Sequence, residues 1–170
     1  MAILVDLNQV VISGIQSQVK SCKINVLNKD LCRHLVLNSI RAIVHKFKRD
    51  YGNVIICCDS RTYWRKSVFP FYKASRKKMR EKSDLDWDMI FEVLAEVRED
   101  LVNIFPYKVI NVDGAEADDI IGTLVPLKLK DENILILSSD GDFLQLQMLN
   151  GETGNIVRQY NPAQKKYVKS

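Results

Sequence analysis

The sequence is poor in the residues that build disulfide frameworks and imidazole metal sites. It contains four cysteines and two histidines among 170 residues. No cysteine pair has the CxxC spacing of a zinc or redox site, and Cys57 and Cys58 fall in a predicted strand, where neighbours point to opposite faces. His34 and His45 lie on a predicted helix with no third ligand nearby, which disfavours a zinc site or a histidine base. We therefore interpret the cysteines as reduced core residues of a cytosolic protein.

Long apolar runs, a leader segment and a phosphate-binding loop are also missing. No apolar run approaches the roughly 18 residues of a membrane-spanning helix, and no signal peptide precedes the first predicted strand. We therefore expect a cytoplasmic protein without a membrane partner. The absence of a P-loop glycine motif argues against a nucleoside triphosphate as the substrate.

What the sequence does contain is a strong separation of charge. The net charge is +4, with 46% hydrophobic and 27% charged residues, as expected for one globular domain. Residues 61–82 hold nine Lys and Arg against one acid, whereas the rest of the chain holds 16 bases and 20 acids. A basic segment beside an acidic remainder suits a polyanionic substrate that is delivered to metal ions.

Four predicted strands each lead into carboxylates. The strands cover residues 2–5, 54–58, 107–112 and 134–137. The carboxylates that follow them are Asp6, Asp59, Glu116, Asp118, Asp119, Asp140 and Asp142. Strands alternating with helices predict an α/β sandwich with a mostly parallel sheet, in which these acids share the edge where open α/β folds bind ligands. The alternative is that each acid serves a separate helix cap or turn, because Asp is common at both. All four predicted strands are followed by acids, however, which favours a shared acidic pocket.

Seven carboxylates in one pocket require cations. Crowded anions raise one another's pKa unless they are neutralised, and oxygen ligands without His or Cys select Mg²⁺ or Mn²⁺ over zinc. Two divalent ions about 4 Å apart would fit, one activating a water and the other stabilising the leaving oxygen. Phosphodiester hydrolysis is the reaction class that this chemistry predicts.

Residues 60–82 mix bases with aromatics. The aromatic residues are Tyr63, Trp64, Phe69, Phe71 and Tyr72. Nucleic-acid bases stack on aromatic rings while phosphates pair with cations, so this composition favours a segment that binds single-stranded nucleic acid. The alternative is a solvated basic loop whose aromatics pack on the flank of the domain.

The remaining pattern is mainly helical. Apolar spacing predicts helices over residues 30–49, 83–105 and 115–130. The second of these would begin with a capping box from Ser83 to Asp86. We interpret residues 7–29 as an irregular turn and a short helix. A further helix is predicted after Asp142, and an edge strand over residues 155–160.

Two blocks of the sequence resemble the signatures of a known family. Gly114–Ile121 and Ser139–Leu146 are similar to the acidic blocks of the 5′ nucleases, which include flap endonucleases and the 5′→3′ exonuclease domain of bacterial DNA polymerase I. Tyr63–Lys66 and Lys165–Lys169 resemble segments of the ribonuclease H of T-even phages. The resemblance covers essentially the whole chain.

The resemblance implies a fold and a role for each candidate residue. The expected fold is a PIN-like three-layer sandwich, in which residues 1–170 form one catalytic domain with a flexible basic arch at about 60–83. The implied metal ligands are Asp6, Asp59, Glu116, Asp118, Asp119, Asp140 and Asp142. Arg65, Lys73 and Arg76 would be catalytic residues that grip the scissile phosphate, and a helical arch would place Lys73 and Arg76 on one face. The implied nucleic-acid-binding residues are Arg61, Tyr63, Trp64, Arg65, Lys66, Tyr72, Lys73, Arg76, Lys77 and Lys78.

The implied activity is that of a metal-dependent 5′→3′ exonuclease and flap endonuclease on DNA and RNA–DNA substrates, as in removal of RNA primers and 5′ flaps. Two Mg²⁺ ions, replaceable by Mn²⁺, would be the cofactors. The implied partners are DNA with a single-stranded 5′ flap, an RNA–DNA hybrid, a single-strand-binding protein or a missing C-terminal half, in the host cytoplasm if a phage encodes the chain. The family's helix-hairpin-helix region, which supplies further Asp ligands, is absent from residues 1–170, so we expect weak or no cleavage by these residues alone.

Two other functions stay open on the sequence. One is a PIN-type ribonuclease acting on structured RNA, against which the long basic and aromatic segment argues. The other is an inactive fragment that binds nucleic acid or pairs with a missing half. Mg²⁺-dependent cleavage of a labelled 5′-flap substrate separates both from a 5′ nuclease.

Overall fold

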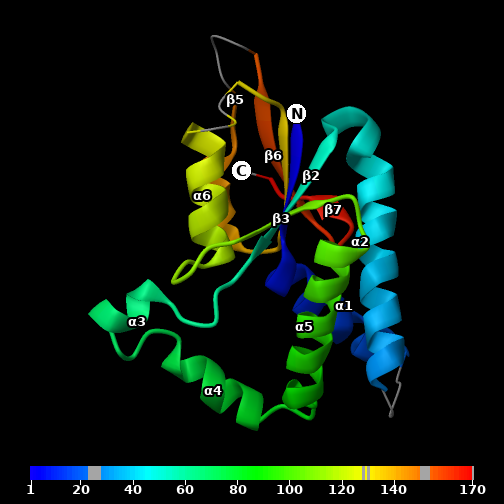
Figure 1. The fold of residues 1–170 in the computed structure, drawn as a ribbon, viewed down its shortest axis with the longest axis vertical. Helices are drawn as coiled ribbons and strands as arrows, with labels where there is room; N and C mark the ends of the chain where they lie inside the picture. The colour runs from blue at the N-terminus through cyan, green and yellow to red at the C-terminus, as the bar shows by residue number, and fades with distance from the viewer. Residues whose placement is uncertain (23–27, 128, 130, 150–153, 170) are drawn as a thin grey trace.

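A mostly parallel sheet forms the centre of the molecule (Figure 1). The structure is a computed structural model that describes residues 1–22, 28–127, 129, 131–149 and 154–169. Its strands are β1 (Ala2–Asp6), β2 (Asn53–Cys58), β3 (Lys108–Asn111), β4 (Ile134–Leu137), β5 (Met148–Leu149), β6 (Ile156–Asn161) and β7 (Lys166–Tyr167). Their order is β3-β2-β1-β4-β6-β5, with β7 also paired to β6. The pairings from β3 through β6 are parallel and those of β5 and β7 antiparallel, which confirms the predicted α/β fold.

Helices cover both faces of the sheet, so the molecule has three layers. One face carries α1 (Leu7–Cys22), α2 (Lys29–Tyr51) and α5 (Trp87–Asn103), and the other carries α6 (Ala117–Leu127). Cys57 faces the α6 side and Cys58 the opposite side, as predicted for neighbours in a strand. Because both faces are covered, β1 and β4 are buried along their whole length, which explains their unbroken apolar sequences. No helix in the described residues is long and apolar enough to cross a membrane.

Helix α1 is longer than the sequence predicted. Leu7–Cys22 form one continuous helix in place of the irregular turn and short helix expected over 7–29, of which residues 23–27 lie outside the described residues. Val10 and Val11 are buried in the same core as α2 and the sheet. Valine, serine and glycine in this segment have low intrinsic helix propensity, so the sequence did not predict a long helix. Packing of its apolar face against the core stabilises the helix in spite of that propensity.

Helix α5 begins later than predicted. Its N-cap is Asp86, whose carboxylate accepts a hydrogen bond from Met89 N at 2.9 Å. Ser83, the predicted cap, instead accepts a hydrogen bond from Leu85 N at 3.3 Å in the preceding turn. Aspartate is itself a strong N-cap, so the capping-box interpretation placed the helix start too early.

The chain after β4 also differs from the prediction. A short 3₁₀ helix, η1 (Gly141–Leu146), replaces the predicted longer helix, and only Phe143 in it is buried. The predicted edge strand is β6, which pairs with β4 on one side and with β5 and β7 on the other. The strands that cover this edge have two residues each, too few to produce a recognisable sequence pattern.

Residues 60–83, here called the basic arm, lie between β2 and α5. They contain two short helices, α3 (Trp64–Val68) and α4 (Ala74–Glu81). Figure 1 shows both helices apart from the sheet and its covering helices. The structure describes the whole arm, and neither helix has a buried side chain. The arm is therefore not part of the hydrophobic core.

Candidate active site

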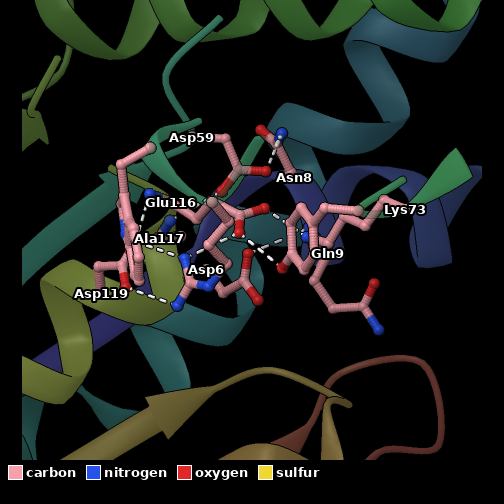
Figure 2. A network of polar contacts seen from close by, with 11 residues as sticks. Asp6, Asn8, Gln9, Asp59, Lys73, Glu116, Ala117 and Asp119 are labelled. Atoms are coloured by element: carbon pink, nitrogen blue, oxygen red, sulfur yellow. Dashed lines mark hydrogen bonds and ion pairs between the residues drawn. The ribbon is translucent and has the colours of Figure 1, made fainter. Parts of the chain in front are cut away.

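Acidic side chains meet at the carboxyl edge of the parallel strands. β1 pairs in parallel with both β2 and β4, so the residues that follow these strands end at the same edge. Asp6 ends β1, Asp59 follows β2, and Asp140 lies shortly after β4. Glu116 and Asp118 come from the start of α6. Figure 2 shows Asp6, Asp59 and Glu116 grouped together.

Several of these carboxylates repel one another. Burial raises the pKa of Asp6 to about 7, and the nearby charges of Asp118 and Asp59 add to the effect. Burial likewise raises the pKa of Asp118 to about 6, helped by the charge of Asp140. The pKa of Asp59 is also raised, again chiefly by burial. Burial first and neighbouring carboxylates second therefore disfavour the charged forms of these acids, and a cation bound at this edge would stabilise them.

Buried polar groups that sequence analysis did not single out hold the turn after β4. The Ser138 hydroxyl donates to Asp6 at 3.0 Å, and its oxygen accepts a hydrogen bond from Asp140 N at 3.1 Å. Gln159, fully buried on β6, donates from Nε2 to the carbonyls of Ser138 and Asp140 at 3.0 and 2.6 Å. The parallel alignment of β4 and β6 creates these contacts. A glutamine within an otherwise strand-like pattern was the only available signal.

Helix α1 supplies two further residues that the sequence analysis missed. Asn8 Nδ2 donates to Asp59 at 2.7 Å, and the backbone N–H of Gln9 donates to Asp6 at 3.2 Å (Figure 2). Asp59 also accepts a hydrogen bond from Ala117 N at 2.7 Å, so α1 and α6 fix it from two sides. The available signal was the polar pair Asn8 and Gln9, which Leu7 separates from the Asp of the first strand.

The basic arm reaches back to Glu116 and Asp119. Arg65 contacts both oxygens of Asp119 at 2.7 and 2.8 Å, and Glu116 Oε2 at 3.0 Å. Lys73 Nζ donates to Glu116 Oε1, and the Tyr72 hydroxyl donates to Oε2 at 2.8 Å. Although burial acts to raise it, hydrogen bonds led by those of Arg65 hold the pKa of Asp119 below its usual range. The arm therefore pairs directly with these two acids, whereas among the described residues it forms no ion pair with Asp6 or Asp118.

The other predicted residues lie mostly in solvent. The exposed members of the nucleic-acid-binding set are Arg61, Trp64, Lys66, Arg76, Lys77 and Lys78. Tyr63 is half-buried, with the ammonium groups of Lys66 and Lys73 at 5.2 and 5.6 Å from its ring centre. Lys73 is the N-cap of α4, so it precedes the helix instead of sharing a helical face with Arg76 as predicted. Asp142 is exposed at the start of η1, where its amide donates to Asp140 at 3.0 Å.

The donor chemistry of the site fits a hard divalent cation. The candidate ligands are all carboxylates, which Mg²⁺ and Mn²⁺ prefer, and a bound cation would stabilise the charged forms of Asp6 and Asp118, which burial and neighbouring acids disfavour. Within the described residues, however, no three Asp, Glu, His or Cys side chains converge tightly enough to hold a metal ion. Glu116 is turned to Lys73 and Arg65, so its use as a ligand requires a rearrangement.

Comparison with known proteins gives close sequence relatives. The family described as 5′-3′ exonuclease, N-terminal resolvase-like domain, matches residues 18–169. The chain is 41% identical over 147 residues to the ribonuclease H of Enterobacteria phage T4. It is 33% identical over 124 residues to a 5′-3′ exonuclease of Buchnera aphidicola subsp. Schizaphis graminum. The matches cover 84% and 72% of this chain but 47% and 40% of the relatives, so the chain spans less than half of their length.

Solved structures share the fold. A flap endonuclease of bacteriophage T5, in a pseudo-enzyme–product complex with DNA and metal ions, has a TM-score of 0.73 at 17% identity, over 98% of this chain and 56% of that one. The T5 5′-exonuclease with zinc bound has a TM-score of 0.72 at 16% identity, over 99% and 58%. At this identity the likeness concerns the fold alone, whereas the sequence matches confirm the predicted resemblance to 5′ nucleases and to T-even phage ribonuclease H. The chain belongs to the 5′-3′ exonuclease family.

Proposed function

We propose that this chain is the catalytic domain of a divalent-metal-dependent 5′ nuclease that hydrolyses phosphodiester bonds in DNA and RNA–DNA substrates. The observation that carries the proposal is the group of carboxylates at the sheet edge, where burial first and neighbouring acids second raise the pKa values of Asp6 and Asp118 to about 7 and about 6. Such a cluster gives the fold no benefit of its own, because uncompensated buried charge is destabilising. It becomes favourable when divalent cations bind beside it.

In this proposal the acids hold two Mg²⁺ ions, which Mn²⁺ can replace. The proposed ligands are Asp6, Asp59, Glu116, Asp118, Asp140 and Asp142, while Asp119 stays paired with Arg65. Bound ions would supply an activated water and stabilise the leaving oxygen. The hydrogen bonds from Ser138 to Asp6 and from Asn8 to Asp59 orient ligand oxygens in advance, as neighbouring groups do at metal sites.

The basic arm is the proposed nucleic-acid contact. Lys73 and Arg76 would bind the scissile phosphate, with Arg65 beside them while it stays paired with Asp119, and the exposed bases of α3 and α4 would bind the phosphates of the flap. The complex of the phage T5 flap endonuclease with DNA and metal ions supports DNA as a partner. The ribonuclease H relative supports an RNA–DNA hybrid as an alternative substrate.

The test is cleavage of a duplex with a labelled 5′ flap, with a 3′ flap and EDTA as controls. We expect short 5′-labelled products only with Mg²⁺, and no products from Asp118→Asn. A fusion to the C-terminal half of phage T4 ribonuclease H, of which this chain spans 47%, distinguishes a weak catalytic domain from an inactive one. Cleavage that persists in EDTA, preference for structured RNA, or a fusion that remains inactive would contradict the proposal.

A further inference from the structure

Glu116 is almost fully enclosed, and the basic arm occupies both of its oxygens. Its side chain is 1% exposed. Lys73 contacts Oε1, whereas Tyr72 and Arg65 contact Oε2 at 2.8 and 3.0 Å. An enclosed carboxylate needs partners of this kind, because a buried charge without a counter-charge is strongly unfavourable. The arm thus fills a role at Glu116 that a bound cation could also fill.

The basic arm has few other attachments to the sheet. No residue of α3 or α4 is buried, although both helices are completely described. At the start of the arm, Trp64 N donates to Gly114 O at 2.9 Å and the indole of Trp64 donates to Asp119 at 3.3 Å. Lys73 has a left-handed backbone with φ 57°, which residues with a Cβ adopt at a cost. The contact with Glu116 coincides with this strained position.

We infer that Lys73 is an exchangeable counterion of Glu116. Without a divalent cation, Lys73 latches the basic arm onto the acid cluster; when a divalent cation binds, it takes the place of Lys73 on Glu116 and frees the arm for nucleic acid. Arg65 is the anchor that remains. The inference rests on the proposed function, because it concerns the same acids as metal ligands.

The difference between Lys73 and Arg65 follows from their contacts. Lys73 Nζ holds Glu116 by one oxygen, and its amino group is compact and flexible. Arg65 also grips both oxygens of Asp119, and its guanidinium lies 4.8 Å from the ring centre of Trp64. Displacing Arg65 would break all of these contacts, whereas displacing Lys73 breaks one ion pair and leaves its neighbours Tyr63 and Tyr72, whose rings lie 5.6 and 5.2 Å from Nζ, on the same arm. Binding linkage is reciprocal. If the Lys73–Glu116 contact weakens cation binding by a certain free energy, cation binding weakens that contact by the same free energy.

The first experiment measures Mg²⁺ binding calorimetrically in the parent chain, in Lys73→Met and in Lys78→Met. Lys78 is the matched control, because it lies exposed on α4 of the same arm and forms no ion pair among the described residues. Both variants lose one positive charge, so the net charge changes equally, while only Lys73 also acts on the charges of Asp59 and Asp118 directly. We expect Lys73→Met alone to lower the Kd for Mg²⁺, by about tenfold. Equal Kd values in the two variants, or weaker binding in Lys73→Met, would overturn the exchange.

The second experiment follows tryptic cleavage within residues 61–82, with circular dichroism as the control for global folding. We expect Mg²⁺ to accelerate cleavage in the parent, and Lys73→Met to be cleaved rapidly without Mg²⁺. A cleavage rate that neither Mg²⁺ nor the substitution changes would show that the arm is not latched. The two proposals fail differently: absence of Mg²⁺ binding in all three chains overturns the metal-dependent function and the exchange together, whereas normal binding without competition overturns only the exchange.

Discussion

Two arginine–aspartate pairs of nearly the same geometry serve different regions of this molecule. Arg33 of α2 contacts both oxygens of Asp100 of α5 at 2.7 Å, and Arg65 contacts both oxygens of Asp119 at 2.7 and 2.8 Å. The first pair joins two helices that already share a continuous apolar core. The second joins the basic arm, whose helices have no buried side chain, to the acid cluster. Only in the second region are polar contacts the main attachment.

The comparison teaches that the surroundings of an ion pair decide what it does. Where apolar burial already holds two elements together, the ion pair adds to the global stability of a region that unfolds cooperatively. Where little apolar surface is buried, the pair governs a local opening that costs much less than global unfolding. We therefore expect the sheet with its covering helices to be the stable region and the arm to detach at a lower free-energy cost.

The largest expected effect is a loss of activity without a loss of stability, when an acid at the carboxyl edge of the sheet is replaced. Asp59→Asn or Asp140→Asn should lower flap cleavage by about a thousandfold, because each removes a proposed ligand charge worth several kcal/mol in the transition state. Thermal stability without metal should hold or rise, since burial of the Asp59 charge is unfavourable. Cleavage rates and Tm are the two measurements. Full activity at saturating Mg²⁺ in either variant would remove that residue from the metal site.

Apolar truncations test the contrast in packing directly. Leu135→Ala, in the fully buried β4, should lower the free energy of unfolding by about 3 kcal/mol. Val68→Ala, 75% exposed at the end of α3, should change it by no more than about 0.5 kcal/mol. Denaturant titration of both variants gives the values. Comparable losses would mean that the arm packs on the sheet in solution.

The two arginines themselves give the next contrast. Arg33→Gln should lower Tm, because it leaves the buried Asp100 without its charged partner. Arg65→Gln should lower Tm less, since Asp119 keeps its hydrogen bonds from Glu116 N and Trp64, but it should speed tryptic cleavage of the arm. If Arg65→Gln lowers Tm more than Arg33→Gln does, the arm does not open independently of global unfolding.

The smallest effect concerns two lysines with the same backbone conformation. Lys165, between β6 and β7, has φ 53°, and Lys73 has φ 57°. Lys165→Gly should stabilise the chain by about 0.5 kcal/mol, because glycine adopts a left-handed conformation without strain. Lys73→Gly should bring no such gain, since it also removes the ion pair with Glu116. An equal gain at both positions, in denaturant titrations, would show that this ion pair contributes nothing to stability.

The local pattern of the sequence was sufficient for the strands and for the acids at their ends. β1 and β4 are apolar runs because both faces of the parallel sheet are covered. The residues of each strand alone therefore indicate that the strand is buried. Strand ends are local features too, so the positions of Asp6, Asp59 and Asp140 at one edge followed from parallel pairing alone. The full length of helix α1 was not predicted, because several of its residues have low helix propensity and the packing of its apolar face is what stabilises it.

The partners of those acids came only from the fold. Ser138 reaches Asp6 across 132 residues of sequence, and Tyr72 reaches Glu116 across 44. No periodicity encodes such distances, because a hydrogen bond depends on separation in space to within a fraction of an ångström. The same holds for charge compensation: Asp118 and Asp119 are neighbours in the chain, yet one has a raised pKa and the other a lowered one. Burial and the position of Arg65 create that difference, and both are properties of the packed molecule.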